Sequence, residues 1–276
     1  MPEGPEIRRA ADKIAKAVVN QPIVELFFAF ERLKPYSDRL AQQRITAVQT
    51  KGKAILMRFD NQLSIYSHNQ LYGVWMIRNA YSFPETNRQL RLAIHTEKKS
   101  ALLYSASDIE VLTEHEVDEH PFLSKLGPDV LDADTTVEQV FDRLTDARFR
   151  RRQLSSLLLD QQFLCGLGNY LRTEVLYVAK LHPLQRPMDC SEESLWALAE
   201  GAIALSRQSY ETGGITNDLQ RALAMKAQGK RRREYRHYAF SRRYKPCYTC
   251  GTTILKDVAG GRRYYYCPAC QPNPKG

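Results

Sequence analysis

Hydrophobic residues recur along the first part of the chain with two different periods. Between Pro5 and Val19 the spacing is that of one face of a helix, and the apolar positions are Ile7, Ala11, Ile14 and Val18. Alternating apolar and polar positions then predict strands, within segments 24–30, 55–59, 63–65, 90–94 and 102–104. Polar breaks at 60–61 and 98–100 separate them. The chain to about residue 120 therefore predicts an antiparallel β domain with a flanking helix.

The period changes to that of helices beyond residue 134. Thr135 and Glu138 form a capping-box pattern before a first apolar-periodic segment. Further helices are predicted near 153–164 and 170–181 and from Ser191 onward. The segment 166–169, Gly-Leu-Gly-Asn, is too rich in glycine to continue a helix. A helical second domain is expected, and the stretch 121–134, which contains Gly127-Pro128-Asp129, is interpreted as a linker.

Length and composition indicate an ordinary protein with two cores. The chain has 276 residues, of which 43% are hydrophobic, enough for two domains. It contains no apolar run of the roughly 18–20 residues that cross a bilayer, and its start lacks the basic-then-apolar order of a signal peptide. We expect a cytoplasmic, nucleoid-associated protein with no membrane contact.

Positive charge is concentrated near the end of the chain. The net charge is +9, but residues 221–276 hold 14 Lys and Arg against only Glu234 and Asp257, which gives +12 there and −3 for the rest. A run of four basic residues occupies 230–233. Because clustered cations bind phosphates, the expected partner is nucleic acid; a solvated basic surface is the alternative.

Four of the six cysteines have the spacing of a metal site. Cys247-x2-Cys250-x16-Cys267-x2-Cys270 is typical of a structural zinc ribbon with two knuckles. In a cytoplasmic protein these residues should not form disulfides. Four thiolates close the coordination shell, so we expect one zinc ion that stabilises structure, in a ribbon that touches DNA. Cys165 and Cys190 lack this spacing and are interpreted as buried apolar residues.

The beginning of the chain offers a covalent catalyst. If Met1 is removed, Pro2 becomes a secondary amine beside the carboxyl group of Glu3. A free α-amine has a pKa of about 7.7–8.0 and is partly nucleophilic near pH 7. Its iminium product cannot lose its charge by deprotonation at nitrogen, so it remains an electron sink. An ordinary disordered start is the alternative.

Several of these motifs together resemble the Fpg/Nei family of DNA glycosylases. The resemblance covers essentially the whole chain and is carried by segments 1–6, 51–53, 166–170 and the four-cysteine ribbon. Gly4 and the block 66–75 are similar to the endonuclease VIII branch. The resemblance implies an α+β fold with two domains: a β-sandwich catalytic domain at 1–124, a linker at 125–134, a helix-two-turns-helix domain at 135–236 and a zinc finger at 237–271.

The resemblance also implies roles for residues at matching positions. Pro2 would attack C1′ of a damaged nucleotide, Glu3 would protonate the sugar ring oxygen, and Glu6 would support this site. Lys53 would transfer a proton in β-elimination, with phosphate binding as an alternative or additional role. Arg262 would serve δ-elimination and hold phosphate, with its neighbour Arg263 as a substitute.

Other matching positions would contact DNA around an extruded base. Gln70, Leu71 and Tyr72 would fill the space that the base leaves, although the last two could instead be core residues. Asn169 would bind phosphate. Lys125 stands where this branch commonly has arginine, and it keeps the charge without bidentate geometry.

The function implied is base excision repair of damaged double-stranded DNA by a monomer with glycosylase and AP lyase activity (β,δ-elimination). Oxidised pyrimidines are the favoured substrates and oxidised purines the alternative. A zinc-ribbon DNA binder without catalysis is a third reading. The segment 213–238 departs from the family pattern because it is longer and more basic than expected.

Overall fold

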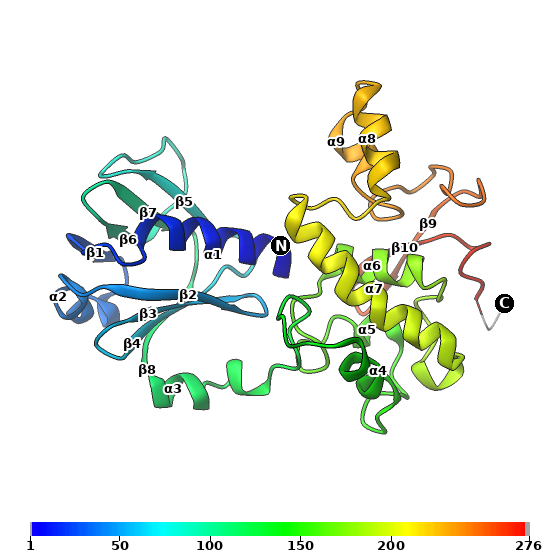
Figure 1. Ribbon diagram of the computed structural model, residues 1–276, viewed down its shortest axis with the longest axis horizontal. Coiled ribbons are helices and arrows are strands. Elements are labelled where there is room, and N and C mark those ends of the chain that lie inside the picture. The colour runs from blue at the N-terminus through cyan, green and yellow to red at the C-terminus, as the bar shows by residue number, and fades with distance from the viewer. Residues whose placement is uncertain (1, 274–276) are drawn as a thin grey trace. The chain divides into compact units, whose positions relative to one another are not determined.

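The chain forms two compact units. The computed structural model describes residues 2–273 (Figure 1). Of these residues, the N-terminal unit contains Pro2 and 6–125, and the C-terminal unit contains 3–5 and 126–273. Glu3, Gly4 and Pro5 therefore pack with residues more than a hundred positions further along the chain.

The N-terminal unit is built from two four-stranded antiparallel sheets. One has the order β1-β6-β7-β5 and the other β2-β3-β4-β8. The strands are β1 Glu25–Phe28, β2 Ile45–Lys51, β3 Ala54–Phe59, β4 Leu63–His68, β5 Val74–Asn79, β6 Leu90–His95, β7 Lys99–Tyr104 and β8 Asp108–Thr113. The helices are α1 Gly4–Val18, which begins in residues of the other unit, α2 Pro35–Leu40 and α3 Glu114–Glu119. The predicted antiparallel β architecture is confirmed.

The apolar face of the first helix is buried as its spacing predicts. Ile7, Ala11, Ile14 and Val18 are all at most 1% exposed and join the core that both sheets contribute to. The alternating pattern did not reveal β2, β5 and β8. Most side chains of β2 and β5 are partly exposed on both faces, so neither of these two strands shows a clean period of two. Ile109 and Val111 of β8 are buried at alternate positions, so a signal was present there and was missed.

The C-terminal unit is helical and ends in a short hairpin. Its helices are α4 Val137–Thr145, α5 Leu154–Leu157, α6 Asn169–Val178, α7 Glu192–Glu211, α8 Leu219–Ala227 and α9 Arg232–Tyr235. Strands β9 Leu255–Ala259 and β10 Arg262–Tyr266 form the hairpin. Residues 170–177 of α6 are all buried, and α6 packs against α7 and β10. The α6 helix therefore organises this unit.

Two details of the helical prediction are wrong. The helix expected near 153–164 is only the short α5, because side chains of Asp160 and Gln161 accept the N–H groups of Gln162 and Gly166 and hold turns there instead. The capping box of α4 is shifted by one residue: Thr136 and Gln139 form it, not Thr135 and Glu138.

The middle of the stretch interpreted as a linker, residues 127–130, is packed within the C-terminal unit. Gly127 N–H donates to Gln161 O at 2.9 Å, and Cys165 N–H donates to Pro128 O at 2.9 Å. Val130 is fully buried in the core of the C-terminal unit. Within residues 2–273, no helix is long and apolar enough to cross a membrane.

Candidate active site and zinc centre

The carboxylate of Glu3 sits on the N-terminus of α6. Its Oε1 accepts the N–H of Tyr170 at 2.7 Å, and its Oε2 accepts the N–H of Leu171 at 3.2 Å. The first N–H groups of a helix have no partner within the helix, and the helix dipole favours a negative charge there. Glu3 is only 4% exposed. The chain start is therefore fixed by backbone groups of the C-terminal unit.

The segment 166–171, which we call the cradle, needs glycine to surround Glu3. A Cβ atom on Gly168 would lie 2.3 Å from Cδ of Glu3. A Cβ atom on Gly4 would lie 2.9 Å from Cα of Gly166, and Gly4 N–H donates to Gly166 O at 2.8 Å. Gly166 itself has φ of +95°. Contact with Glu3 and Gly4 thus explains the glycines at 4, 166 and 168.

Arg172 links two predicted DNA-binding groups. Its Nη2 atom donates to Asn169 Oδ1 at 2.8 Å and to the backbone oxygen of Arg263 at 2.7 Å. Because the Asn169 oxygen is engaged, its NH₂ group remains as the donor that a phosphate needs. Burial, with Arg262 nearby, lowers the pKa of Arg172 to about 10, so it stays charged at pH 7. The structure thus brings Glu3, Asn169 and the Arg262 hairpin to one end of α6.

The hairpin presents its arginines on a tight turn. Gly260 and Gly261 have φ of +55° and +73°, as a type I′ turn requires at both central positions. Ala259 and Arg262 pair on either side of the turn. Arg262 and Arg263 are both exposed. The double glycine therefore serves the hairpin that carries these cations.

Glu174 anchors the segment that leads to the zinc ribbon. Its carboxylate accepts the N–H groups of Tyr238, Ala239 and Phe240 at 2.6–2.8 Å and the Thr216 hydroxyl at 2.5 Å. Burial raises the pKa of Glu174, while these hydrogen bonds act in the opposite direction. The Thr216 hydroxyl donates its hydrogen to Glu174. His237 Nδ1, which lies 2.8 Å from the Thr216 oxygen, therefore donates to that oxygen. His237 is thereby held neutral next to Tyr170.

In the N-terminal unit, Lys53 lies in the two-residue turn between β2 and β3. Gly52, the first turn residue, has φ of +58°, and Lys51 pairs with Ala54 across the turn. Lys53 is 8% exposed. Ala54 also pairs with His68, the last residue of β4. This pairing brings Lys53 beside the loop that follows β4.

That loop, Asn69–Gly73, is the wedge loop, and it exposes two large apolar side chains. Leu71 is 59% exposed and Tyr72 is 70% exposed, so the alternative that they are core residues is wrong. Gln70 Oε1 accepts the Ser107 hydroxyl at 2.9 Å, and Arg88 donates to the backbone oxygen of Tyr72 at 2.6 Å. The loop is therefore held by hydrogen bonds to Ser107 and Arg88, while the side chains of Leu71 and Tyr72 face solvent.

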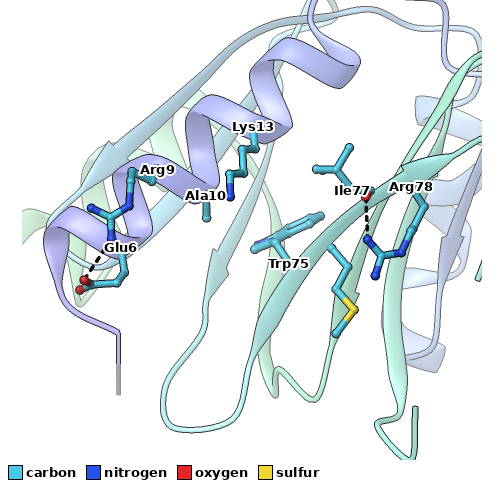
Figure 2. A pocket seen from close by; sticks show the side chains of 8 residues that line it. Glu6, Arg9, Ala10, Lys13, Trp75, Ile77 and Arg78 are labelled. Carbon is cyan, nitrogen blue, oxygen red and sulfur yellow. Dashed lines mark hydrogen bonds and ion pairs between the residues drawn. The ribbon is translucent and has the colours of Figure 1, made fainter. Parts of the chain in front are cut away.

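Glu6 borders a groove between α1 and β5 (Figure 2). Its carboxylate pairs with Arg9 at 3.1 Å. The groove has a volume of about 440 Å³ and is also lined by Lys13, Trp75 and Arg78, with Ala10, Met76 and Ile77.

Of the remaining predicted site residues, Pro2 is half-buried. Lys125, at the end of the 3-10 turn Leu123–Lys125, is exposed. Met1 lies outside the described residues.

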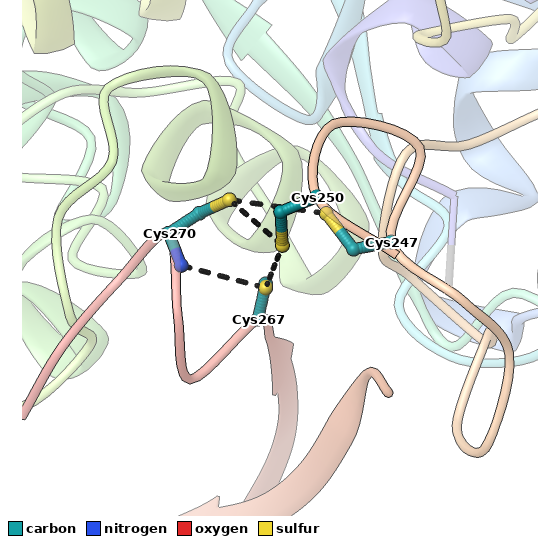
Figure 3. Close-up of side chains that lie close together, drawn as sticks. All are labelled: Cys247, Cys250, Cys267 and Cys270. Carbon is teal, nitrogen blue, oxygen red and sulfur yellow. Dashed lines mark hydrogen bonds between the residues drawn. The ribbon is translucent and has the colours of Figure 1, made fainter. Parts of the chain in front are cut away.

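The four predicted cysteine ligands converge (Figure 3). Their sulfur atoms all lie within 4.8 Å of one another. Sγ–Sγ distances are 3.4 Å for Cys250 and Cys267, 3.5 Å for Cys250 and Cys270, and 3.9 Å for Cys247 and Cys270. A tetrahedral zinc ion with bonds of about 2.3 Å separates its sulfur ligands by about 3.8 Å. The geometry and the donor set fit one structural zinc ion, which supplies stability and no chemistry.

Neighbouring groups favour thiolates at this site. The Tyr177 hydroxyl lies 3.0 Å from Cys247 Sγ, and the N–H groups of Thr249 and Cys270 point to Cys247 Sγ and Cys267 Sγ at 3.4 and 3.5 Å. Gln271 is fully buried; it accepts the Cys267 N–H and donates to Leu181 O. The second half of α6 and the turn that follows it thus hold the zinc ribbon.

Sequence reasoning missed the buried polar residues Arg172, Glu174, Tyr177 and Gln271. A signal was present for two of them, since Arg172 and Glu174 interrupt an otherwise apolar segment on both sides. A charged side chain surrounded by apolar neighbours in a buried helix must have partners.

Comparisons with known proteins agree with this architecture. Residues 1–107 match the formamidopyrimidine-DNA glycosylase N-terminal domain, 126–221 its H2TH domain and 245–273 the zinc finger found in FPG and IleRS. The chain is 47% identical to Endonuclease 8 of Klebsiella pneumoniae (strain 342) and 46% identical to that of Escherichia coli (strain K12 / DH10B). Both alignments cover 98% of this chain and all of the relative.

The fold is also that of a protein whose structure was solved in complex with DNA. The chain is similar to Lactococcus lactis formamidopyrimidine-DNA glycosylase bound to DNA with an AP site, with a TM-score of 0.81 and 20% identity over 98% of this chain and all of that one. Fold and site define a DNA repair enzyme with a zinc finger, and DNA is its partner. The chain belongs to the Fpg/Nei family and is a bifunctional DNA glycosylase and AP lyase of base excision repair.

Proposed function

We propose that the enzyme removes oxidised pyrimidines from double-stranded DNA through a Schiff base on Pro2. The observation that carries this proposal is the fixed position of Glu3, whose carboxylate is held by two N–H groups of α6. The adjacent residue is Pro2, so removal of Met1 places a secondary amine one residue from a positioned carboxyl group. Identity of 46–47% to Endonuclease 8 proteins favours this branch of the family.

The proposed reaction begins at C1′ of the extruded nucleotide. The Pro2 nitrogen attacks C1′, and the base leaves with the electron pair of the broken bond. The amine passes its proton to the Glu3 carboxylate, and the sugar ring opens as Glu3 gives that proton to the ring oxygen. The resulting iminium draws electrons from the sugar, so the phosphates leave by β- and then δ-elimination. Lys53 transfers a proton in the first elimination and Arg262 supports the second, with Glu6 assisting near the amine.

The remaining predicted residues bind the duplex. Gln70, Leu71 and Tyr72 enter the space that the damaged base leaves, which fits the exposure of the last two side chains. Asn169 offers its NH₂ group to a phosphate, since Arg172 occupies its oxygen. Lys125 adds a cation from the N-terminal unit.

Reductive trapping tests the covalent step. Incubation with abasic or thymine glycol duplex and sodium borohydride should give a protein–DNA adduct, and its intact mass should show the loss of Met1. Protein that keeps Met1, made by inserting a residue that prevents its removal, is the matched control and should give no adduct. Cleavage of damaged DNA by zinc-loaded, proline-started protein without any adduct would contradict the proposal.

Competition between lesions tests the substrate class. Equal amounts of duplexes with thymine glycol and with 8-oxoguanine should be cleaved with a clear preference for the pyrimidine. Faster excision of the purine would assign the alternative class to the same catalytic residues.

We propose further that the enzyme acts as a monomer in the cytoplasm, associated with the nucleoid. The boundaries 1–124, 125–134, 135–236 and 237–271 stay predictions of the sequence. Sedimentation of the free protein tests the first point, and limited proteolysis tests the boundaries.

A further inference from the structure

The helices α8 and α9 form an arm, residues 219–235, that projects from the C-terminal unit (Figure 1). Asp218 caps α8 by accepting the Arg221 N–H at 2.7 Å, and Gly229, with φ of +75°, turns the chain towards α9. The two ends of the arm are joined at its base: Asn217 Nδ2 donates to Tyr235 O at 3.0 Å, and Thr216 N–H donates to Arg236 O at 2.9 Å. The arm is therefore a defined hairpin of helices.

The arm carries a dense cluster of exposed cations. The cluster consists of Lys226, Lys230, Arg231, Arg232 and Arg233, all exposed. Glu234 is the single acidic residue of the arm, and its carboxylate accepts the backbone N–H of Arg231 at 2.9 Å. Within residues 2–273, none of the five side chains forms an ion pair, although Arg232 donates to the Gly213 carbonyl. Such unneutralised charge is the footprint of a polyanionic partner.

Tyr248 fastens the arm to the first zinc knuckle. Its hydroxyl donates to Glu234 O at 2.9 Å, and its ring centre lies 4.7 Å from the guanidinium carbon of Arg221 and 3.5 Å from that of Arg242. Tyr248 stands between the zinc ligands Cys247 and Cys250. Because zinc fixes both flanking cysteines, it also fixes the residue on which the arm rests.

The base of the arm adjoins the cradle. The Arg236 guanidinium carbon lies 5.5 Å from the ring centre of Tyr170, and the His237 ring lies 5.3 Å from it. The N–H of this tyrosine holds Glu3. The cation cluster therefore belongs to the same compact unit as the carboxylate of Glu3. A phosphate that binds the arm thus takes a fixed position relative to this carboxylate.

We propose that the arm is an additional DNA-binding surface that grips the phosphate backbone near the lesion, and that the zinc knuckle positions it through Tyr248. This inference rests on the proposed function only in taking duplex DNA as the substrate. Cations that neutralise phosphates release counterions, so the contribution of the arm is a salt-dependent one.

A triple variant measures the contribution of the arm. Lys230→Ala/Arg231→Ala/Arg233→Ala leaves Arg232 on its carbonyl partner. The matched control is Lys16→Ala/Arg44→Ala/Lys98→Ala, which removes three exposed charges from the N-terminal unit. Dissociation constants for an undamaged duplex are measured between 50 and 200 mM salt. The slope of log K against log salt should fall by about 2–3 for the arm variant, at about 0.9 per phosphate, and by less than one for the control. Equal slopes for the two variants would overturn the proposal.

Two substitutions of Tyr248 measure the anchoring. Tyr248→Ala keeps every arm cation but removes the support, so at full zinc content it should lower the slope nearly as far as the triple variant. Tyr248→Phe keeps the ring between the arginines and should lie close to the wild type. A wild-type slope for zinc-loaded Tyr248→Ala would overturn the anchoring. Borohydride trapping at low salt should persist in all variants. Its absence in the wild type would count against the proposed function, whereas normal trapping with unchanged slopes would count against the arm alone.

Discussion

The cradle and the wedge loop hold their side chains in opposite environments. In each, a glycine leaves room for a close neighbour: a Cβ atom on Gly168 would lie 2.3 Å from Cδ of the Glu3 side chain, and one on Gly73 would lie 2.6 Å from the backbone oxygen of Asn69. The cradle buries the carboxylate that it binds, whereas the wedge loop exposes Leu71 and Tyr72. A group for chemistry needs one fixed position, and a group for insertion into DNA needs solvent access before binding.

The largest effect is expected where the cradle has no room. Gly168→Ala should displace Glu3 or the start of α6 by about an ångström, and a displacement of that size costs about 100-fold or more in rate. Single-turnover excision of thymine glycol, measured with saturating enzyme, checks this prediction.

Gly201→Ala provides the matched control. Gly201 lies within α7, and an added Cβ would come within 3.0 Å of the Val178 side chain and would otherwise make ordinary contacts with Val175 at 3.9–4.0 Å. Alanine also favours a helix. Its excision rate should stay close to that of the wild type, and a similar loss in both variants would show that the effect of Gly168→Ala is general destabilisation.

The wedge loop should show a smaller and conditional effect. Leu71→Ala/Tyr72→Ala removes the side chains proposed to replace the extruded base, so excision from duplex DNA should fall about tenfold, which corresponds to about 1.4 kcal/mol. Excision from single-stranded lesion DNA should change little, because no stack must be refilled. Thermal stability should also stay constant, since both side chains are exposed. Equal losses on both substrates would remove the distinction between the wedge loop and the cradle.

The last expected effect concerns stability and leaves the excision rate unchanged: it is a pH dependence near the cradle. Burial, with Arg236 and Arg232 nearby, lowers the pKa of His237 to about 3. Between pH 6.5 and 3, His237 is protonated in the unfolded chain but stays neutral in the folded protein. The free energy of unfolding therefore decreases as the pH falls, by up to about 1.4 kcal/mol per pH unit. Melting temperatures of the wild type and His237→Asn should therefore converge between pH 7 and 5.

His68, at the base of the wedge loop, is the counterpart in the other unit. Burial lowers the pKa of His68 as well, but Asp108 opposes this shift. His68→Asn should show weaker convergence with the wild type over the same range. Parallel melting curves for His237→Asn would contradict the assignment of a neutral buried histidine.

The spacing of residues along the chain was sufficient to predict the structure where a pattern fits only one kind of structure. The helix Gly4–Val18 and the four zinc ligands were evident from periodicity and from cysteine spacing. The same reasoning failed at 153–164, where side chains of Asp160 and Gln161 compete with the helix for backbone N–H groups. It also left Leu71 and Tyr72 open between core and surface, because apolar residues in a short loop satisfy either pattern.

The amino-acid sequence by itself determined the class of fold, the zinc ribbon, the basic end of the chain and the residues that resemble a repair glycosylase. Only the tertiary structure decided that Glu3 lies on the N-terminus of α6 and that Arg172 joins Asn169 to the Arg263 backbone. It alone placed Tyr248 beneath the α8–α9 arm. The physical reason is that composition and spacing report local preferences, whereas a buried charge or an exposed aromatic is defined by partners distant in the chain.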